Sequence, residues 1–294
     1  MSRPEPWRSA PAKVNLGLAV RGRRGDGFHE LDGVMALIDL ADSLALAEAA
    51  ASPAPDRLER VPAGDGWLDR IAIPLDDGNL ILQAARLYRE AARERGVELP
   101  ALTWRLIKRV PIAAGLGGGS SDAAAALRLL DQRYPAGLDL LALAQRLGSD
   151  VPFFVLGVAA ARARGRGERL DPVRVPAQPL VLVNPGVGVR AADAFRWWDG
   201  RRPAAVAGAA AAWWSGPDVT NELEPGVAAH VPEVRAVLDM LRAAWDGPVA
   251  MSGSGATCFA LAPGVRAAQA LADELRRRLA PSAWVALSTI SERG

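Results

Sequence analysis

The first half of the chain mixes strand-like and helix-like patterns of apolar positions. Two β-rich segments, Lys13–Arg21 and Val34–Leu46, predict strands, the second of them one strand or two. From Asn79 to about Arg95, apolar residues recur at helical spacing behind an asparagine that can cap a helix. The other elements predicted in this half are a strand over Thr103–Val110, a loop over Pro111–Gly119, a helix over Asp122–Asp131 that Ser120 and Ser121 open, and a helix over Leu138–Leu147. We therefore expect a mixed α+β unit.

The second half alternates strands and helices after a less regular middle at Arg162–Arg169. A strand is predicted at Leu180–Val183, and the Ala-rich segment Arg201–Gly216 is predicted to be a surface insert. The elements that follow are a helix over Val234–Trp245, a strand over Val249–Met251, a strand over Thr257–Ala262, a helix over Val265–Leu279 and a strand over Trp284–Ile290. This order predicts an α/β sandwich and two domains that divide near Gly165.

Length and composition narrow the class of protein. A chain of 294 residues, of which 50% are hydrophobic, can bury the core of one large or two modest domains. The single cysteine, Cys258, excludes an internal disulfide and a multi-cysteine zinc site, which favours a reducing, cytoplasmic setting. Residues 1–15 lack the apolar core of a signal peptide, and the longest apolar runs are shorter than the roughly 20 residues of a membrane span. We expect a soluble intracellular protein.

The basic residues are almost all arginine. Among 35 lysines and arginines, only Lys13 and Lys108 are lysines, and the only histidines are His29 and His230. Because the arginines are scattered among 33 acidic residues, the sequence pI of 9.1 does not predict nucleic-acid binding. The histidines do not stand at metal-ligand spacing, so no metal site is assigned.

The most informative segment is Pro111–Leu127, with the sequence PIAAGLGGGSSDAAAAL. Four glycines between positions 115 and 119 separate a predicted strand from a predicted helix, and without Cβ atoms they let backbone N–H groups approach an anion closely. The hydroxyls of Ser120 and Ser121 and the positive end of the helix add to this, so the segment predicts a polyphosphate site. It matches neither the P-loop nor the dinucleotide-binding pattern. The alternative is a flexible linker before an Ala-rich helix.

A second turn of small residues, Ser252–Ala256, lies between two predicted strands. Gly253, Ser254 and Gly255 can close on a phosphate chain or support the first loop, and a tight hairpin is at least as good an interpretation. The spacing differs from the G-x-S-x-G of a hydrolase nucleophile.

Lys13 and Asp150 are the candidate pair for chemistry. Lys13 lies in a predicted strand where an apolar residue is the ordinary choice, and Asp150 stands at the edge of an apolar turn. Burial raises the pKa of a carboxyl group and a nearby lysine lowers it, and such a pair suits a general base acting on a substrate hydroxyl. The alternatives are a helix cap for Asp150 and a surface position for Lys13.

Aromatic and histidine residues form a further candidate site. Phe28 and His29, in the turn Gly25–Glu30, can stack on a base and hydrogen-bond its edge, although an exposed histidine in a hairpin is an even alternative. Phe195 can supply a second ring or pack in a core. Cys258 is predicted to be buried filler, and His230 to be structural.

Several motifs together resemble those of the GHMP small-molecule kinases. They are PAKVNLGL at 11–18, RGDGFHELDGVMALIDLAD at 24–42, VPIAAGLGGGSSDAAAAL at 110–127, LGSDVPFF at 147–154, NPGVGV at 184–189, TNELE at 220–224 and SGSGATCFAL at 252–261. Within this superfamily the closer resemblance is to the branch that phosphorylates the 2-hydroxyl of 4-diphosphocytidyl-2-C-methyl-D-erythritol in the non-mevalonate (MEP) route to isoprenoids. Phe28 stands where that branch commonly has tyrosine, and Asn221-Glu222 where it often has Asn-Asp.

The resemblance implies an α+β fold of two domains. They are an N-terminal unit like the second domain of ribosomal protein S5 over residues 1–165, carrying the ATP-phosphate loop, and a C-terminal ferredoxin-like α/β sandwich over 166–294. It implies ATP as co-substrate, Mg²⁺ bound with ATP, a small-molecule substrate, and neither nucleic acid nor membrane as partner. The chain is expected to be a monomer or a homodimer.

The resemblance also assigns residues. Asp150 is implied to be the base and Lys13 to orient the hydroxyl and the acid. The ATP-phosphate loop is implied to be Pro111, Ile112, Ala113, Ala114, Gly115, Leu116, Gly117, Gly118, Gly119, Ser120 and Ser121. The substrate site is implied to be Asn15, Phe28, His29, Phe195, Gly253, Ser254 and Gly255, with the three aromatic or histidine rings holding cytosine. The alternatives are another GHMP kinase, of the homoserine or mevalonate type, and a regulatory nucleotide-binding protein on the same scaffold.

Overall fold

The computed structural model describes residues 6–48, 56–64, 66, 68–201 and 218–292. The chain divides into two compact units, each containing strands and helices. The first comprises Met1–Ala12, Leu40–Ile112 and Gly117–Gly157, and the second comprises Lys13–Asp39, Ala113–Leu116 and Val158–Gly294. Strands β1 (Arg8–Arg23) and β2 (His29–Glu48) contribute residues to both units. The division into domains at 1–165 and 166–294 stays a prediction.

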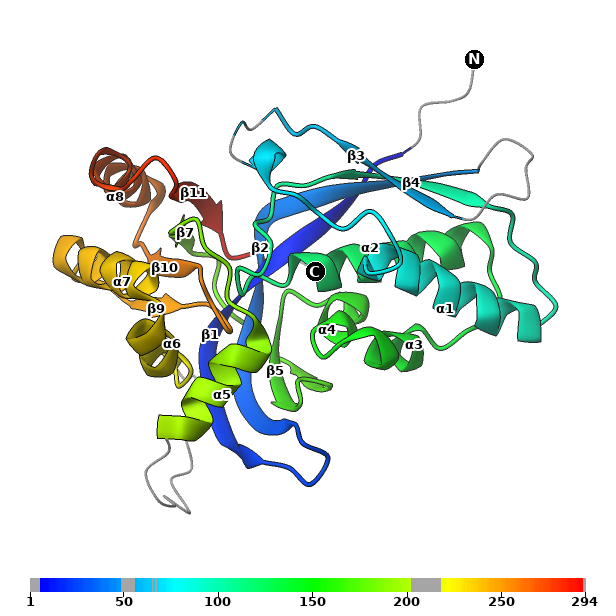
Figure 1. Cartoon of the computed structure of the whole chain (residues 1–294), viewed down its shortest axis with the longest axis horizontal. Helices are drawn as coiled ribbons and strands as arrows, with labels where there is room; N and C mark the ends of the chain where they lie inside the picture. The colour runs from blue at the N-terminus through cyan, green and yellow to red at the C-terminus, as the bar shows by residue number, and fades with distance from the viewer. Residues whose placement is uncertain (1–5, 49–55, 65, 67, 202–217, 293–294) are drawn as a thin grey trace. The chain divides into compact units, whose positions relative to one another are not determined.

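The first unit combines strands with a group of four helices (Figure 1). The later part of β2 pairs antiparallel with β4 (Leu102–Ile107), with Ser43 opposite Ile107, and β3 (Arg57–Val61) runs parallel to β4. The helices are α1 (Leu80–Glu94), α2 (Gly118–Arg133), α3 (Leu140–Leu147) and α4 (Val151–Leu156), with a 3₁₀ turn at Leu68–Arg70. Helix α2 packs against α1, α3 and α4, and residues 123–127 of it are buried, so the helix following the glycines belongs to the core.

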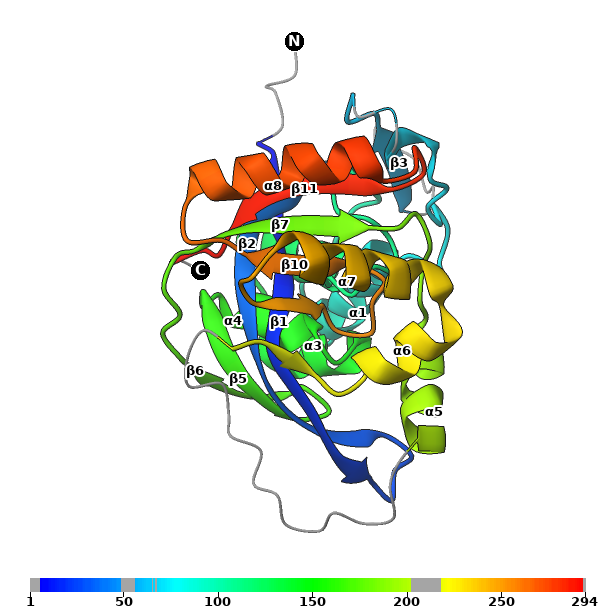
Figure 2. The same cartoon turned by 90° about the vertical axis from the view of Figure 1, so that its left-hand side faces the viewer.

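The second unit contains a four-stranded sheet in the order β11-β7-β10-β9, with every neighbouring pair antiparallel. These strands are β7 (Pro179–Asn184), β9 (Val249–Met251), β10 (Cys258–Leu261) and β11 (Trp284–Thr289). Helices α7 (Pro232–Ala244) and α8 (Val265–Arg278) lie over one face of this sheet (Figure 2). The helices α5 (Ala191–Arg201) and α6 (Glu224–His230) pack on each other.

The remaining strands of the second unit pair with the earlier part of β2 and with β1. Strand β5 (Ala160–Gly165) is antiparallel to β2, β6 (Arg169–Pro172) is antiparallel to β5, and the short β8 (Thr220–Asn221) is parallel to β1. Asn221 is therefore the register partner of Leu18, although the two are more than two hundred residues apart in the chain.

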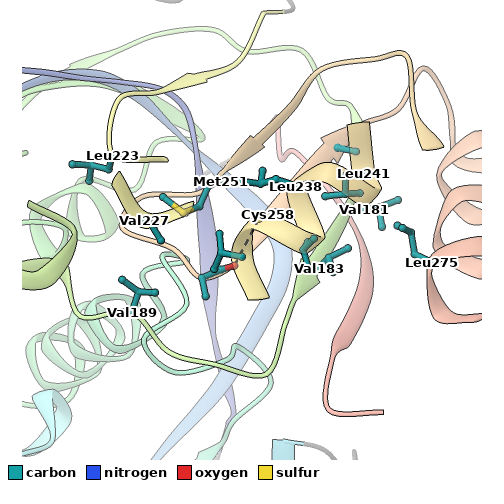
Figure 3. Packing of buried hydrophobic residues seen from close by; sticks show 14 of the residues in the cluster. Val181, Val183, Val189, Leu223, Val227, Leu238, Leu241, Met251, Cys258 and Leu275 are labelled. Carbon is teal, nitrogen blue, oxygen red and sulfur yellow. Dashed lines mark hydrogen bonds between the residues drawn. The ribbon is translucent and has the colours of Figure 1, made fainter. Parts of the chain in front are cut away.

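Aliphatic side chains from the sheet and from α6, α7 and α8 form a continuous core in this unit (Figure 3). Cys258 is fully buried among them, and its thiol donates to the carbonyl of Ala256 at 3.8 Å. Burial raises the pKa of this thiol, which is therefore a packing residue rather than a nucleophile. The prediction for Cys258 is confirmed.

Most predicted elements are present, and two expectations were wrong. Asn79 caps α1 through its side chain as expected, accepting from the N–H of Ile81. The segment Arg162–Arg169, expected to be irregular, contains the end of β5 and the start of β6, because Arg162 and Arg164 alternate with small alanines and pair with acids. The helix expected from Asp122 begins at Gly118, so Ser120 and Ser121 lie in its first turn instead of before it.

The expected surface insert at 201–216 lies outside the described residues except for Arg201, which ends α5. No described helix combines the length and the apolar character that crossing a membrane requires.

Candidate active site

Strand β1 brings Lys13 and Asn15 to one side of the strand, because residues two apart share a face. Both side chains are buried, with 3% and 5% of their surface exposed. The ammonium group of Lys13 donates to the side-chain oxygen of Asn15. A surface position for Lys13, the alternative left open by the sequence, is therefore wrong.

The turn Ser252–Gly255 packs directly on this pair. The N–H of Asn15 donates to the hydroxyl of Ser252 at 3.3 Å, and that hydroxyl donates to the carbonyl of Gly115 at 2.9 Å. Gly253 has φ +53°, and a Cβ there would lie 3.1 Å from the Lys13 ammonium and 3.0 Å from the carbonyl oxygen of Gly115. The turn joins β9 to β10 as a hairpin and also supports the glycine loop, as expected. That it closes on a phosphate chain stays a prediction.

The middle of the glycine loop, Ala113–Leu116, is fixed by backbone hydrogen bonds. The carbonyls of Ala113, Ala114 and Leu116 accept from Val189, Thr257 and Lys13 at 3.0, 3.1 and 3.0 Å. At Gly115, with φ +75°, a Cβ would overlap the carbonyl oxygen of Ser252. The loop is therefore a tightly held structure, and the linker interpretation is wrong.

Three motifs that are far apart in the sequence thus meet in the second unit. They are the start of β1 with Lys13 and Asn15, the middle of the glycine loop, and the turn with Gly253, Ser254 and Gly255.

Asn221, which sequence reasoning did not select, holds that turn in place. Its side-chain amide donates to the carbonyls of Met251 and Gly253, at 2.7 Å each, and its oxygen accepts from the N–H of Leu223 at 2.9 Å. The signal available in the sequence was the TNELE motif, which carried no role without knowledge of its distant partners.

The rest of the glycine loop lies in the first unit with the start of α2. Pro111 is buried, Ile112 is exposed, and Gly117 adopts φ +71° at the position before the helix. The first N–H groups of a helix have no partner within it, and Gly119 and Ser120 at this end are at least partly exposed. The hydroxyl of Ser121 is buried, with no hydrogen bond to any described residue. This end of α2 offers donors to an anion.

A buried ion group lies beside this helix start. Lys108 donates to Asp122 at 2.7 Å and also to Asp42, and a Cβ on Gly118 would lie 3.0 Å from the Lys108 ammonium. Burial alone lowers the pKa of Lys108, but the charges of Asp122 and Asp42 outweigh it and raise this pKa. Burial raises the pKa of Asp122 to about 7, with Lys108 opposing and Asp42 reinforcing the change.

Asp150 occupies the position before α4 in the first unit and is half-buried. Its side chain makes no capping hydrogen bond to the helix, so the alternative of a helix cap does not account for this residue.

The predicted ring cluster forms in part. His29 stacks on Phe195 with ring centres 4.6 Å apart and planes at 14°, and it meets the edge of Trp198 at 5.7 Å. Phe28 is 48% exposed, and the guanidinium of Arg166 lies over its ring at 4.7 Å. His230 is structural as expected: its Nδ1 is 2.9 Å from the carbonyl of Gly226, and its ring stacks on Trp197.

Comparison with known proteins decides the family. Residues 79–158 match the GHMP kinases N terminal domain, and residues 203–281 match the GHMP kinases C terminal domain. The 4-diphosphocytidyl-2-C-methyl-D-erythritol kinase of Deinococcus radiodurans is 43% identical, over 96% of this chain and 92% of its own length. The chain belongs to the 4-diphosphocytidyl-2-C-methyl-D-erythritol kinase family of the GHMP kinases.

Other relatives agree with this membership. The enzyme of the same name from Thermus thermophilus is 42% identical over 92% of both chains. A crystal structure of a 4-(cytidine 5'-diphospho)-2C-methyl-D-erythritol kinase superposes with a TM-score of 0.74 at 37% identity, covering 97% of this chain and 100% of that one. Homoserine kinase from Cytophaga hutchinsonii, at 18% identity and a TM-score of 0.65, shares the fold. This GHMP kinase therefore has the expected α+β architecture and is an ATP-dependent small-molecule kinase.

Proposed function

We propose that this kinase transfers the γ-phosphoryl group of ATP to the 2-hydroxyl of 4-diphosphocytidyl-2-C-methyl-D-erythritol, in the non-mevalonate route to isoprenoid precursors. The observation that carries the proposal is the buried Lys13, packed between Asn15, the Gly253 turn and the glycine loop, in a chain 43% identical to a kinase of that name. We expect the enzyme to be located in the cytoplasm.

The proposed mechanism uses positioning more than covalent chemistry. The N–H groups at the start of α2 and the glycine loop hold the ATP phosphates, and the chain places the substrate hydroxyl in line with the γ-phosphorus. Asp150 accepts the hydroxyl proton as the O–P bond forms, and Lys13 orients the hydroxyl. The phosphoryl group leaves the β-phosphate oxygen, which departs as ADP.

Magnesium fits this arrangement as a companion of ATP. No group of three potential acidic, histidine or cysteine ligands occurs in the part of the chain that the structure describes. Magnesium commonly binds substrate phosphates with few protein ligands, and the unpartnered hydroxyl of Ser121 is an oxygen of suitable kind beside the helix start. When bound, magnesium neutralises charge on the phosphates.

The test is a phosphorylation assay with 4-diphosphocytidyl-2-C-methyl-D-erythritol, mevalonate and homoserine, run on the wild type, Asp150→Asn and Lys13→Ala. We expect turnover only of the cytidine compound and a loss of roughly 10²- to 10⁴-fold in kcat for Asp150→Asn, with ATP affinity nearly unchanged. Lys13→Ala should lose kcat to a similar degree.

Asp139→Asn is the matched control, because Asp139 caps α3 in the same unit and asparagine caps equally well. It should retain wild-type turnover. Full turnover by Asp150→Asn would refute the role of the base, and a preference for mevalonate or homoserine would refute the substrate.

A further inference from the structure

One face of α5 holds the ring of His29. Phe195, Trp198 and Asp199 are spaced by three and four residues, so they project from the same side of the helix. Phe195 covers a face of the imidazole, Trp198 meets it edge-on, and Asp199 contacts its Nε2 at 2.9 Å. The histidine side chain is only 9% exposed, so α5 fixes both the plane and the rotation of the ring.

The contact with Asp199 also determines which ring nitrogen carries the proton. An ionised carboxylate only accepts hydrogen bonds, so Nε2 must be the protonated nitrogen. In the neutral ring Nδ1 then bears a lone pair. Among the residues that the structure describes, none makes a hydrogen bond to Nδ1, which leaves this acceptor for a ligand.

We propose that Asp199 is a positioning residue that holds His29 in the Nε2–H tautomer, so that Nδ1 accepts a hydrogen bond from the exocyclic amino group of a cytosine ring. This proposal rests on the proposed function. The corresponding position of a uracil ring is a carbonyl oxygen, which would oppose the Nδ1 lone pair. Asp199 thereby makes the site selective for amino-pyrimidines over keto-pyrimidines, and neither Asp199 nor Trp198 was selected from the sequence.

The kinetic test compares Asp199→Asn and Asp199→Glu with Asp193→Asn. Asp193 lies on the same helix and pairs with Arg196, so it controls for removal of one charge from α5. For Asp199→Asn we expect the KM of the cytidine substrate to rise roughly 10-fold, with kcat and the KM of ATP little changed, because an amide can donate to Nε2 as well as accept from it and so no longer fixes the Nε2–H tautomer. The preference for the cytidine over the matching uridine compound, in kcat/KM, should fall by a similar factor.

Asp199→Glu keeps a carboxylate and should recover part of the selectivity, whereas Asp193→Asn should behave as the wild type. Asp199→Asn with wild-type KM and wild-type selectivity would overturn the proposal. So would an equal effect of Asp193→Asn.

The tautomer itself is measurable, because the chain has only two histidines. Imidazole ¹⁵N spectra of the wild type at about pH 8, where an ordinary imidazole is neutral, should show the His29 proton on Nε2, and His230→Gln assigns the signals. A proton on Nδ1 of His29 would overturn the proposal without any substrate. If the wild type fails to phosphorylate the cytidine compound, the proposed function fails, while the same spectrum of Asp199→Asn, with the proton no longer held on Nε2, still decides whether Asp199 sets the tautomer.

Discussion

Replacing Asp122 by asparagine tests how the buried ion group of Lys108, Asp42 and Asp122, beside the start of α2, changes stability with pH. Asp122 is 3% exposed, and one of its oxygens accepts from Lys108 while the other has no hydrogen-bonding partner among the described residues. Asp42, whose side chain is fully buried, shares the same lysine. One ammonium group thus serves two carboxylates, and keeping both ionised leaves an excess negative charge in the interior.

The direction of the pH effect follows from the pKa of Asp122, which burial raises from 3.8 to about 7. A group whose pKa is raised in the folded state binds its proton more tightly there than in the unfolded chain. Its contribution to stability is complete below the unfolded value and is lost as the pH rises through the folded value. Between pH 5 and pH 8 the wild type should therefore lose about 2 to 3 kcal/mol of unfolding free energy through this group.

The assay is urea unfolding, followed by circular dichroism at several pH values from 5 to 8. Asp122→Asn removes the titrating group while keeping an acceptor for Lys108, so its unfolding free energy should fall less than that of the wild type across this range. Asp131→Asn, on the same helix, keeps an acceptor for the hydroxyl of Tyr88 and should follow the wild-type curve. If Asp122→Asn and the wild type show the same pH dependence, the reasoning about the buried excess charge is wrong.

Two further predictions concern the support of the glycine loop. Gly115→Ala should cost more than about 2 kcal/mol of stability and lower kcat/KM at least tenfold, because its Cβ would overlap the carbonyl oxygen of Ser252. The control is Gly96→Ala, which has nearly the same φ of +77° but open space around it. It should cost only about 1 to 2 kcal/mol. Similar losses in urea unfolding for both variants would show that the close approach is unimportant. Asn221→Ala removes three buried hydrogen bonds and should cost about 2 to 4 kcal/mol of stability while lowering kcat. If this variant unfolds and turns over like the wild type, the Ser252–Gly255 turn does not need Asn221 to keep its conformation.

The elements that could be predicted from the sequence are those whose signal lies in their own residues. The helix α1 has both its cap, Asn79, and its apolar spacing within one segment. The start of α2 was misplaced because glycine disfavours a helix, whereas here Gly118 and Gly119 form the first turn. Strand β5 was missed because its inward residues are alanines, which carry little apolar signal, and its outward residues are arginines.

The same distinction applies to the site. The glycine loop was readable because an anion site needs backbone without side chains, and that need shows directly in the composition of Pro111–Ser121. Asn221 and Asp199 act through partners 30 and 170 residues away, so their own neighbours in the sequence say nothing of the contact. The roles of these two residues become visible only once the fold brings their distant partners next to them.

The structure gives a reason why this arginine-rich chain has lysine at positions 13 and 108. Each ammonium lies against a glycine: a Cβ on Gly253 would be 3.1 Å from that of Lys13, and a Cβ on Gly118 would be 3.0 Å from that of Lys108. The planar guanidinium of arginine is wider than an ammonium group and needs room for a fork of donors. Both lysines are buried, at 3% and 6% exposed, and each ammonium lies close to a residue without a Cβ atom, so a compact charge fits where a guanidinium would need more room. The lysines and the glycines of these motifs therefore depend on each other.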